Sequence, residues 1–408
     1  MRVVRNFETL EKIISKKRRY NTKLTDRVAK ILKDVKEKGD DALIEYTRRF
    51  DKVSLQSNQL RISESEISAA FNELDSKIIQ SLKIVIDNVT KFYKKEASIN
   101  FKCIRENNGK VLISKYIPLE RVGIYIPAAS APLVSTVYMS AIPAIVAGVK
   151  EIVLVSPPLK DKTINPFILA VASLLKIKEI YRIGGAQAIA ALAYGTKTIK
   201  KVDKIIGPGN EFVTEAKRQV FGQVDIDMLA GPSEIAIIAS RGSNVDYIIA
   251  DLEAQLEHRK GLGIVITNSK KIIKELRAKK TAGFVLRVKN LEEACFVANK
   301  IAPEHLEIFS KTPRKLLKKI KNAGAIFLGE NSPVAVGDYT AGPSHILPTG
   351  GTARFFSSLS VREFLKEVHI INYTKKALQD EYDVLEKIAS LEGLTKHLES
   401  VKKRLQEQ

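Results

Sequence analysis

Apolar residues in the first hundred positions recur at spacings of three and four, the pattern of amphipathic helices. Val28, Ile31, Leu32 and Val35 form one such stripe within a long predicted helix, Thr25–Phe50. Further helices are predicted over Glu8–Lys17, Glu66–Ala70 and Asp75–Lys95. The run from Ser63 to Glu66 has the spacing of a capping box. This region predicts structure and carries no evident chemistry.

From about residue 111, short β-branched runs alternate with helical patterns or Gly/Pro breaks. Strands are predicted at Val111–Ser114, Arg121–Ile126, Glu151–Val155, Glu179–Ile183 and Lys204–Ile206, and helices at Ser135–Ala147, Phe167–Lys176, Ala186–Tyr194 and Glu211–Val220. Alternation of this kind predicts a parallel sheet with helices on both faces. Ligands of such sheets bind in the loops that follow the strands, at their carboxyl ends.

A second series of the same kind follows. Strands are predicted at Glu234–Ala239, Gly263–Thr267, Gly283–Leu286 and Ala325–Leu328, and helices at Asp246–His258, Lys270–Lys279, Leu291–Ile301 and Lys315–Asn322. Helices return at Asp380–Ala389 and Leu394–Leu405. The pattern therefore predicts two α/β units in tandem, with helical extensions at the two ends.

Composition narrows the class of protein. With 408 residues and 45% hydrophobic content, the chain is long enough for packed cores in two or three domains. It contains no apolar run long enough to span a membrane, and its first residues lack a secretory-signal pattern, so we expect a cytoplasmic protein. Two cysteines in unrelated contexts argue against a disulfide framework or a thiolate metal site.

The net charge of +21 raises the possibility of nucleic-acid binding. The basic residues are scattered, mixed with Glu and Asp, and not interleaved with aromatic residues as a stacking surface would be. We therefore expect a lysine-rich solvated surface and no specific nucleic-acid partner.

Two groups of polar residues are candidates for chemistry. Gln255 and His258 lie three apart in a predicted helix, so they could share a metal ion, with Asp338 and His397 as further ligands. Glu304 and His305 follow Pro303 at what the pattern predicts to be a helix entrance, and could act as general acid and base. Each group also has a purely structural interpretation, as a polar helix face or a helix-dipole contact.

Loops rich in Gly and Pro carry the remaining candidates. Gly337–Thr349 holds Asp338 and His345 in a stretch that predicts a loop. Gly184-Gly185, which opens a predicted helix, could offer backbone N–H groups to a phosphate or could serve close packing. No G-x-G-x-x-G fingerprint is present, so the sequence does not indicate a conventional dinucleotide site.

Taken together, these motifs resemble the histidinol dehydrogenase family. The resemblance covers residues from about 110 to 400 and rests on Gly184–Gly195, Gly207–Asn210, Val213–Arg218, Asp227–Glu234, Gln255-x-x-His258, Ala302–Leu306, Gly337–Tyr339, His345–Thr349 and Glu392–His397. Many motifs in the same order make chance similarity very improbable.

The resemblance implies an enzyme that uses zinc and NAD to oxidise L-histidinol through histidinal to L-histidine. It implies that zinc, one per subunit, is held by Gln255, His258, Asp338 and His397. His305 corresponds to the general base, and Glu304 to the residue that activates water in the second oxidation. Substrate contacts are implied for the following residues: Ser233, Gln255, His258, His305, Asp338, His345, Glu392 and His397.

The resemblance also implies the cofactor site and the assembly. Tyr125, Gln187 and Asn210 correspond to the NAD contacts, on incomplete Rossmann-like units. The C-terminal segment is expected to cross to the partner subunit of a homodimer, where Glu392 and His397 would complete the partner's site.

The resemblance further predicts four regions of the chain. They are a first Rossmann-like domain with the metal and catalytic residues (21–117 plus 236–360), a second with the NAD site (118–235), a small extension domain (1–20 plus 361–385) and a C-terminal helical segment (386–408).

The sequence departs from the family pattern at three places. Ala128-Ala129 stands where the family has two glycines, Val334 replaces a glutamate, and Arg259–Gly263 replaces a turn that contains proline. Two alternatives stay open: a zinc- and NAD-dependent dehydrogenase of another amino alcohol, for which Val334 is the main argument, and a basic nucleic-acid-binding protein on a non-catalytic scaffold.

Overall fold

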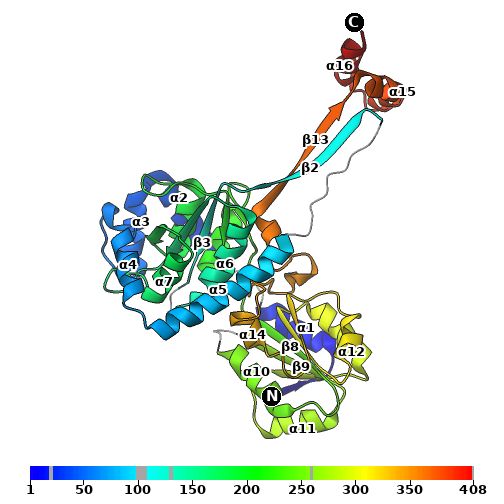
Figure 1. Ribbon diagram of the computed structural model, residues 1–408. Helices are drawn as coiled ribbons and strands as arrows, with labels where there is room; N and C mark the ends of the chain where they lie inside the picture. The colour runs from blue at the N-terminus through cyan, green and yellow to red at the C-terminus, as the bar shows by residue number, and fades with distance from the viewer. Residues whose placement is uncertain (18–21, 98–107, 128–131, 258–260, 407–408) are drawn as a thin grey trace. The chain divides into compact units, whose positions relative to one another are not determined.

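The fold was obtained as a computed structural model, which describes residues 1–17, 22–97, 108–127, 132–257 and 261–406. The chain forms two compact units (Figure 1). The first consists of Met1–Glu96 and Leu119–Phe364, and the second of Ala97–Pro118 and Leu365–Gln408. The first unit contains two parallel sheets, and the second an antiparallel two-stranded ribbon and two helices.

One sheet of the first unit has five parallel strands in the order β5-β4-β3-β6-β7. They are β3 (Arg121–Tyr125), β4 (Glu151–Ser156), β5 (Glu179–Arg182), β6 (Lys204–Ile206) and β7 (Asp225–Ile226). The accompanying helices are α6 (Val134–Ala147), α7 (Pro166–Leu174), α8 (Gly185–Tyr194) and α9 (Glu211–Val220). The strand order reverses direction at β3, so the segments that follow β3 and β6 are neighbours at the carboxyl edge, where such sheets bind ligands.

The other sheet has six parallel strands in the order β1-β10-β9-β8-β11-β12. They are β1 (Arg2–Val4), β8 (Glu234–Ala239), β9 (Leu262–Thr267), β10 (Phe284–Arg287), β11 (His305–Phe309) and β12 (Ala325–Leu328). One face buries apolar residues with α1 (Phe7–Lys17) and α12 (Leu291–Ile301), and the other with α10 (Val245–Leu256) and α11 (Lys270–Ala278). Burial on both faces explains the near-continuous Ile/Val runs of the central strands.

Between α1 and the five-stranded sheet, the described chain forms the helices α2 (Thr22–Lys38), α3 (Asp40–Phe50), α4 (Glu64–Asn72) and α5 (Ser76–Ala97). The prediction of a single helix over Thr25–Phe50 is wrong, because Gly39 has a φ of 56° and separates α2 from α3. The predicted apolar stripe of α2 is buried, in a core shared with α8 and α9.

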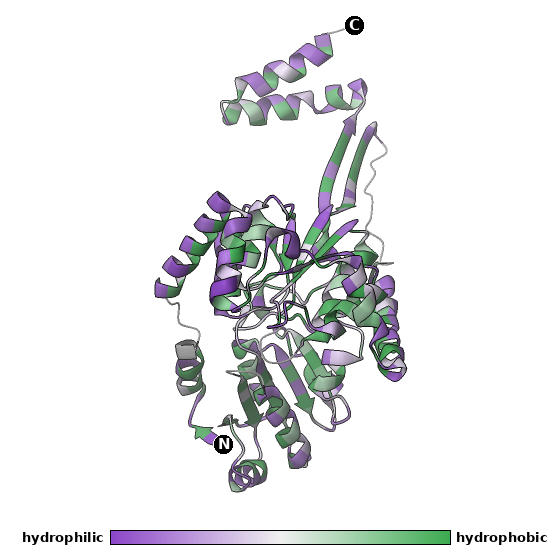
Figure 2. Cartoon of the chain, turned by 90° about the vertical axis from the view of Figure 1, so that its left-hand side faces the viewer, coloured by the Kyte–Doolittle hydropathy of each residue, from purple (hydrophilic) through white to green (hydrophobic). Residues whose placement is uncertain are grey.

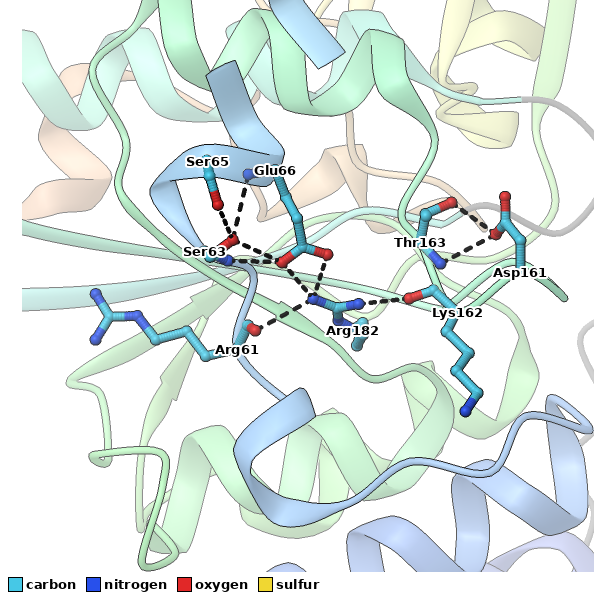
Figure 3. A network of polar contacts seen from close by, with 8 residues as sticks. All are labelled: Arg61, Ser63, Ser65, Glu66, Asp161, Lys162, Thr163 and Arg182. Carbon is cyan, nitrogen blue, oxygen red and sulfur yellow. Dashed lines mark hydrogen bonds and ion pairs between the residues drawn. The ribbon is translucent and has the colours of Figure 1, made fainter. Parts of the chain in front are cut away.

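A polar network attaches the start of α4 to β5 (Figure 3). The predicted capping box is confirmed, because the Glu66 N–H donates to Ser63 Oγ and the Ser63 N–H donates to Glu66 Oε2. Arg182, which is buried, donates from Nη2 to both Glu66 carboxylate oxygens at 2.8 Å. It also donates to the carbonyls of Lys162 and Arg61. Arg182 is thus paired and hydrogen-bonded as a buried charge must be.

The second unit contains β2 (Lys110–Pro118) and β13 (Leu365–Tyr373), paired antiparallel, followed by α15 (Lys375–Leu391) and α16 (Thr395–Gln406). Among its described residues, only Ala377 is buried. Figure 2 shows apolar stretches on the strands and helices of this unit. The exposed large apolar side chains are Val368, Ile370, Ile371, Val384, Ile388, Leu391 and Leu394.

The predicted fold class, α/β with parallel sheets, is confirmed. The remaining helical segments are α13 (Pro313–Leu317), which is shorter than predicted, and α14 (Val334–Tyr339). Strand β11 was not predicted. No helix in the described part of the chain is long and apolar enough to cross a membrane. The division into four regions stays a prediction.

Candidate functional site

The carboxylate of Glu304 lies at the amino ends of two neighbouring strands. Glu304 directly precedes β11, and Ser233 directly precedes β8. Ser233 Oγ donates to Glu304 Oε2 at 2.6 Å, and the backbone N–H of Glu234 donates to the same oxygen at 2.9 Å. Gln255 Nε2, from the last turn of α10, donates to Ser233 Oγ at 2.5 Å. Three segments therefore meet around one carboxylate.

His305 is the first residue of β11 and lies between two carboxylates. Its Nδ1 is 3.7 Å from Glu304 Oε2, and its Nε2 is 3.8 Å from Asp338 Oδ1. The ring packs at 6.0 Å, centroid to centroid, from Phe327 of β12, and it is 4% exposed. An imidazole held in this way between acidic groups is placed to exchange protons near neutral pH.

One expectation about this pair is wrong. Glu304 and His305 do not enter a helix; His305 begins the buried strand β11, because its N–H and C=O groups join the ladder with β8 and β12. The polar cluster lies at the amino ends of β8 and β11. The helix-dipole interpretation of Glu304 therefore does not apply.

The segment Gly337–Thr349 was predicted to be a loop, but its first residues belong to α14. Asp338 is in this helix, and its backbone carbonyl lies 3.0 Å from His345 Nδ1. His345 Nε2 is 3.4 Å from Thr136 Oγ1 of α6, so His345 links the Asp338 segment to a helix of the other sheet. Burial raises the pKa of Asp338, the charge of His305 opposes this rise, and the charge of Glu304 adds to it.

The four predicted metal ligands are only partly brought together. Gln255 and Asp338 both lie near the Glu304–His305 pair, whereas His258 lies outside the described residues. His397 belongs to the second unit. Within the described residues, no group of three or more His, Cys, Asp or Glu side chains could hold a metal ion.

The donor types nevertheless fit a divalent ion. An amide, a carboxylate and imidazoles form an oxygen and nitrogen set that suits zinc. Gln255 uses its amide nitrogen for Ser233, so the amide oxygen is the atom that could bind a metal. The raised pKa of Asp338 marks a partly buried carboxylate whose charge a cation would stabilise.

The three predicted cofactor contacts lie at the carboxyl edge of the five-stranded sheet. Tyr125 ends β3, and its hydroxyl accepts the Gly185 N–H at 3.1 Å. Gln187, in the first turn of α8, is buried, and its Oε1 has no hydrogen-bond partner among the described residues. Asn210 caps α9 by accepting from the N–H groups of Phe212 and Val213.

Close packing explains the glycine at position 184, and a hydrogen bond to Tyr125 satisfies the N–H of Gly185. A Cβ at Gly184 would lie 2.5 Å from the Pro157 side chain, so the position favours glycine. The N–H of Gly185 already has the Tyr125 hydroxyl as its partner. Ala128-Ala129, the family departure nearest to Tyr125, lies outside the described residues.

Glu392 and His397 lie at the junction of α15 and α16, where Gly393 has a φ of 69°. Both side chains are exposed, as is most of the second unit. The structure thus brings these two predicted residues to one helix–turn–helix corner.

Two pairs of ionisable side chains were not predicted from the sequence. Lys217 and Asp227 form a buried ion pair, and they bond the C=O and N–H of Gly207, so they anchor the loop that precedes Asn210. The buried Glu307 of β11 and the partly exposed Asp251 of α10 form a carboxyl pair. Neither pairing follows from the local sequence pattern, because each joins residues that only long-range packing brings together.

An acid, an imidazole and a hydroxyl converging on a parallel α/β scaffold define an enzyme with general acid–base groups. Comparison with known proteins specifies which enzyme family. The model of the family "Histidinol dehydrogenase" matches residues 14–405. The chain belongs to the histidinol dehydrogenase family, and is thereby an oxidoreductase.

Individual relatives agree with this assignment. The histidinol dehydrogenase of Clostridium acetobutylicum is 45% identical over 403 residues, covering 94% of this chain and 93% of the relative. That of Methanocaldococcus jannaschii is 42% identical over 98% of this chain and 96% of the relative. The crystal structure of histidinol dehydrogenase from Elizabethkingia anophelis superposes with a TM-score of 0.88 at 38% identity, covering 94% of this chain and 92% of that one.

We predict opposite effects of Asp338→Asn on stability and on metal binding. Because burial raises the pKa of Asp338 in the folded chain, its ionisation lowers folding stability as pH rises above the ordinary carboxyl range. The metal-free variant should therefore melt about 1–2 °C above metal-free wild type at pH 7.5. Added zinc should raise the melting temperature of wild type and leave the variant unchanged.

The measurement is thermal unfolding with a chelator or with zinc, repeated at pH 5, where the difference between the metal-free proteins should shrink. A metal-free variant that melts below wild type would contradict the assignment of a partly buried, destabilising carboxylate.

Proposed function

We propose that this chain is a zinc-dependent histidinol dehydrogenase, which uses NAD to oxidise L-histidinol to L-histidine through histidinal. The observation that carries the proposal is the cluster of Ser233, Glu304, His305 and Asp338 at the amino ends of β8 and β11. Both oxidations require a proton acceptor beside the reacting carbon, and the second also requires an activated water.

His305 is the proposed base for the first oxidation. Its position between Glu304 and Asp338 stabilises the imidazolium that forms when it takes the hydroxyl proton. Bound NAD would supply the acceptor for the hydride from the carbon that carries this hydroxyl. The burial of His305 keeps bulk water from competing for the proton.

Glu304 is the proposed base for the second oxidation, in which water adds to the aldehyde. Ser233 and the Glu234 N–H both bond to Oε2, so they fix the orientation of the carboxylate. A carboxylate held in this orientation is placed to take a proton from water. The 3.7 Å separation from His305 lets the two groups act on one bound substrate.

Zinc would be held by Gln255, His258, Asp338 and His397, and would bind the imidazole and amine of the substrate and polarise it. The amide oxygen of Gln255 and the partly buried carboxylate of Asp338 support this assignment. NAD would lie at the carboxyl edge of the five-stranded sheet. The Oε1 of Gln187 is buried and has no hydrogen-bond partner among the described residues, which is costly, and this supports a polar ligand there.

A homodimer is proposed for the second unit. A two-stranded ribbon with two helices cannot bury its apolar residues internally, and only Ala377 among its described residues is buried. Val384, Ile388 and Leu391 are spaced four and three apart on α15, so they form one exposed apolar stripe. A second copy of the chain would cover this surface and receive Glu392 and His397 in its own site.

The primary test is NADH formation when L-histidinol is added to the purified protein with NAD. We expect NADH from wild type, its loss after chelation and its return with zinc. His305→Asn should lower kcat by about 10²- to 10⁴-fold, because the base is removed while the side-chain size is kept. Absence of NADH, or NADH formation at an unchanged rate after chelation, would overturn the proposal. A larger kcat/KM for an amino alcohol without an imidazole would favour the alternative substrate class.

A subunit-mixing experiment tests the shared site. His305→Asn and His397→Ala homodimers should each be inactive. After dissociation and random reassociation of equal amounts, half of the dimers are mixed, and one of the two sites in each mixed dimer has both histidines. About one quarter of the wild-type activity should return. No recovery, despite confirmed mixed dimers, would show that His397 does not act in the partner's site.

A further inference from the structure

Asp251 and Glu307 lie on the same two elements as Gln255 and His305, next to the Glu304–His305 cluster. Glu307 lies two residues after His305 in β11, so both side chains are on the same face of the sheet. Asp251 lies four residues before Gln255 in α10, so these two are on the same face of the helix. The carboxyl pair thus lies next to the site, on the same two elements.

The carboxyl group of Glu307 is incompletely satisfied. Glu307 is 0% exposed, and its Oε2 has no hydrogen-bond donor among the described residues. Asp251 of α10 interacts with Glu307. Two carboxyl groups can share a hydrogen bond only when one of them carries a proton. Burial, followed by the charge of Asp251, accordingly raises the pKa of Glu307 well above its usual range.

The other oxygen of Glu307 binds the start of α14. Its Oε1 accepts the backbone N–H of Val334 at 3.3 Å. Asp338 lies one turn further along α14, and it approaches His305 of the same strand. Helix α14 is therefore hydrogen-bonded to β11 through Val334 and Glu307, and its Asp338 carboxylate lies 3.8 Å from His305 Nε2 of the same strand. The neighbours of Glu307 on the adjacent strands, Ile237 and Phe327, are apolar and offer no competing contact.

We propose that Asp251 and Glu307 are positioning residues that set the separation of Gln255 and Asp338 around His305. Glu307 holds the helix that carries Asp338, and Asp251 holds the helix that carries Gln255. The pair acts through these groups and touches neither substrate nor metal. This proposal rests on the proposed function, because Gln255 and Asp338 are taken there as zinc ligands.

The replacement Glu307→Gln tests whether the contacts of Glu307 matter or its ability to ionise. A glutamine oxygen can accept from the Val334 N–H, and its NH₂ can donate to Asp251, so both contacts persist. Glu307→Met has similar size and loses both contacts. We expect zinc affinity, measured by competition with a chromogenic chelator, to be within about threefold of wild type for Gln and at least about tenfold weaker for Met. Wild-type affinity in the folded Met variant would overturn the proposal.

A second pair of variants covers the case in which Glu307→Met does not fold. Val334→Pro removes the single N–H that binds Glu307, at the first position of α14, where proline is compatible with a helix. Val334→Ala keeps the N–H and serves as the control for the lost side chain. Zinc affinity should fall at least about threefold more for Pro than for Ala; equal affinities would contradict the positioning role.

Spectra of the cobalt-substituted proteins give a measurement that a simple loss of folding stability would not change. The visible absorption of bound Co²⁺ reports ligand geometry. It should match wild type in Glu307→Gln and Val334→Ala and change in Glu307→Met and Val334→Pro. Failure of wild type itself to bind zinc would refute the proposed function, whereas identical zinc affinities and cobalt spectra in all variants would refute only the positioning role.

Discussion

Glu304 Oε2 accepts two hydrogen bonds from the segment that enters the neighbouring strand, one from Ser233 Oγ and one from the Glu234 N–H. This contact fixes the ends of β8 and β11 relative to each other and orients the carboxylate beside His305. Gln255 joins through Ser233, and Asp338 joins through His305. Every proposed role in the site depends on this chain of contacts, because each group is placed by the one before it.

The sequence alone predicted most of the architecture. Strands such as β8 and β9 are runs of Ile and Val bounded by Gly or Pro, so their periodicity is unambiguous. The prediction from sequence failed for β11, because His305 and the buried Glu307 interrupt the apolar run and suggest the polar start of a helix. A buried carboxyl group is expected only if a partner is known, and Asp251 is 56 positions away in the sequence. Sequence patterns do not report such pairings.

The site residues were found through motifs and family resemblance, and local pattern did not suffice. The spacing of Gln255 and His258 is equally compatible with an ordinary polar helix face. The local sequence also does not show which of Asp338 and His345 would be the metal ligand. The structure distinguishes them in part: Asp338 directs its carboxylate to His305, whereas His345 contacts a backbone carbonyl and Thr136. Roles that need the partner subunit or bound groups stay proposals.

Glu304 and His305 are proposed to serve two successive oxidations of one bound substrate. The yield of NADH from a limiting, known amount of L-histidinol taken to completion tests this proposal. Wild type should form two NADH per histidinol, and Glu304→Gln should form the second at least about 10²-fold more slowly than wild type. A wild-type yield of one NADH per histidinol, with the aldehyde as the final product, would contradict the claim.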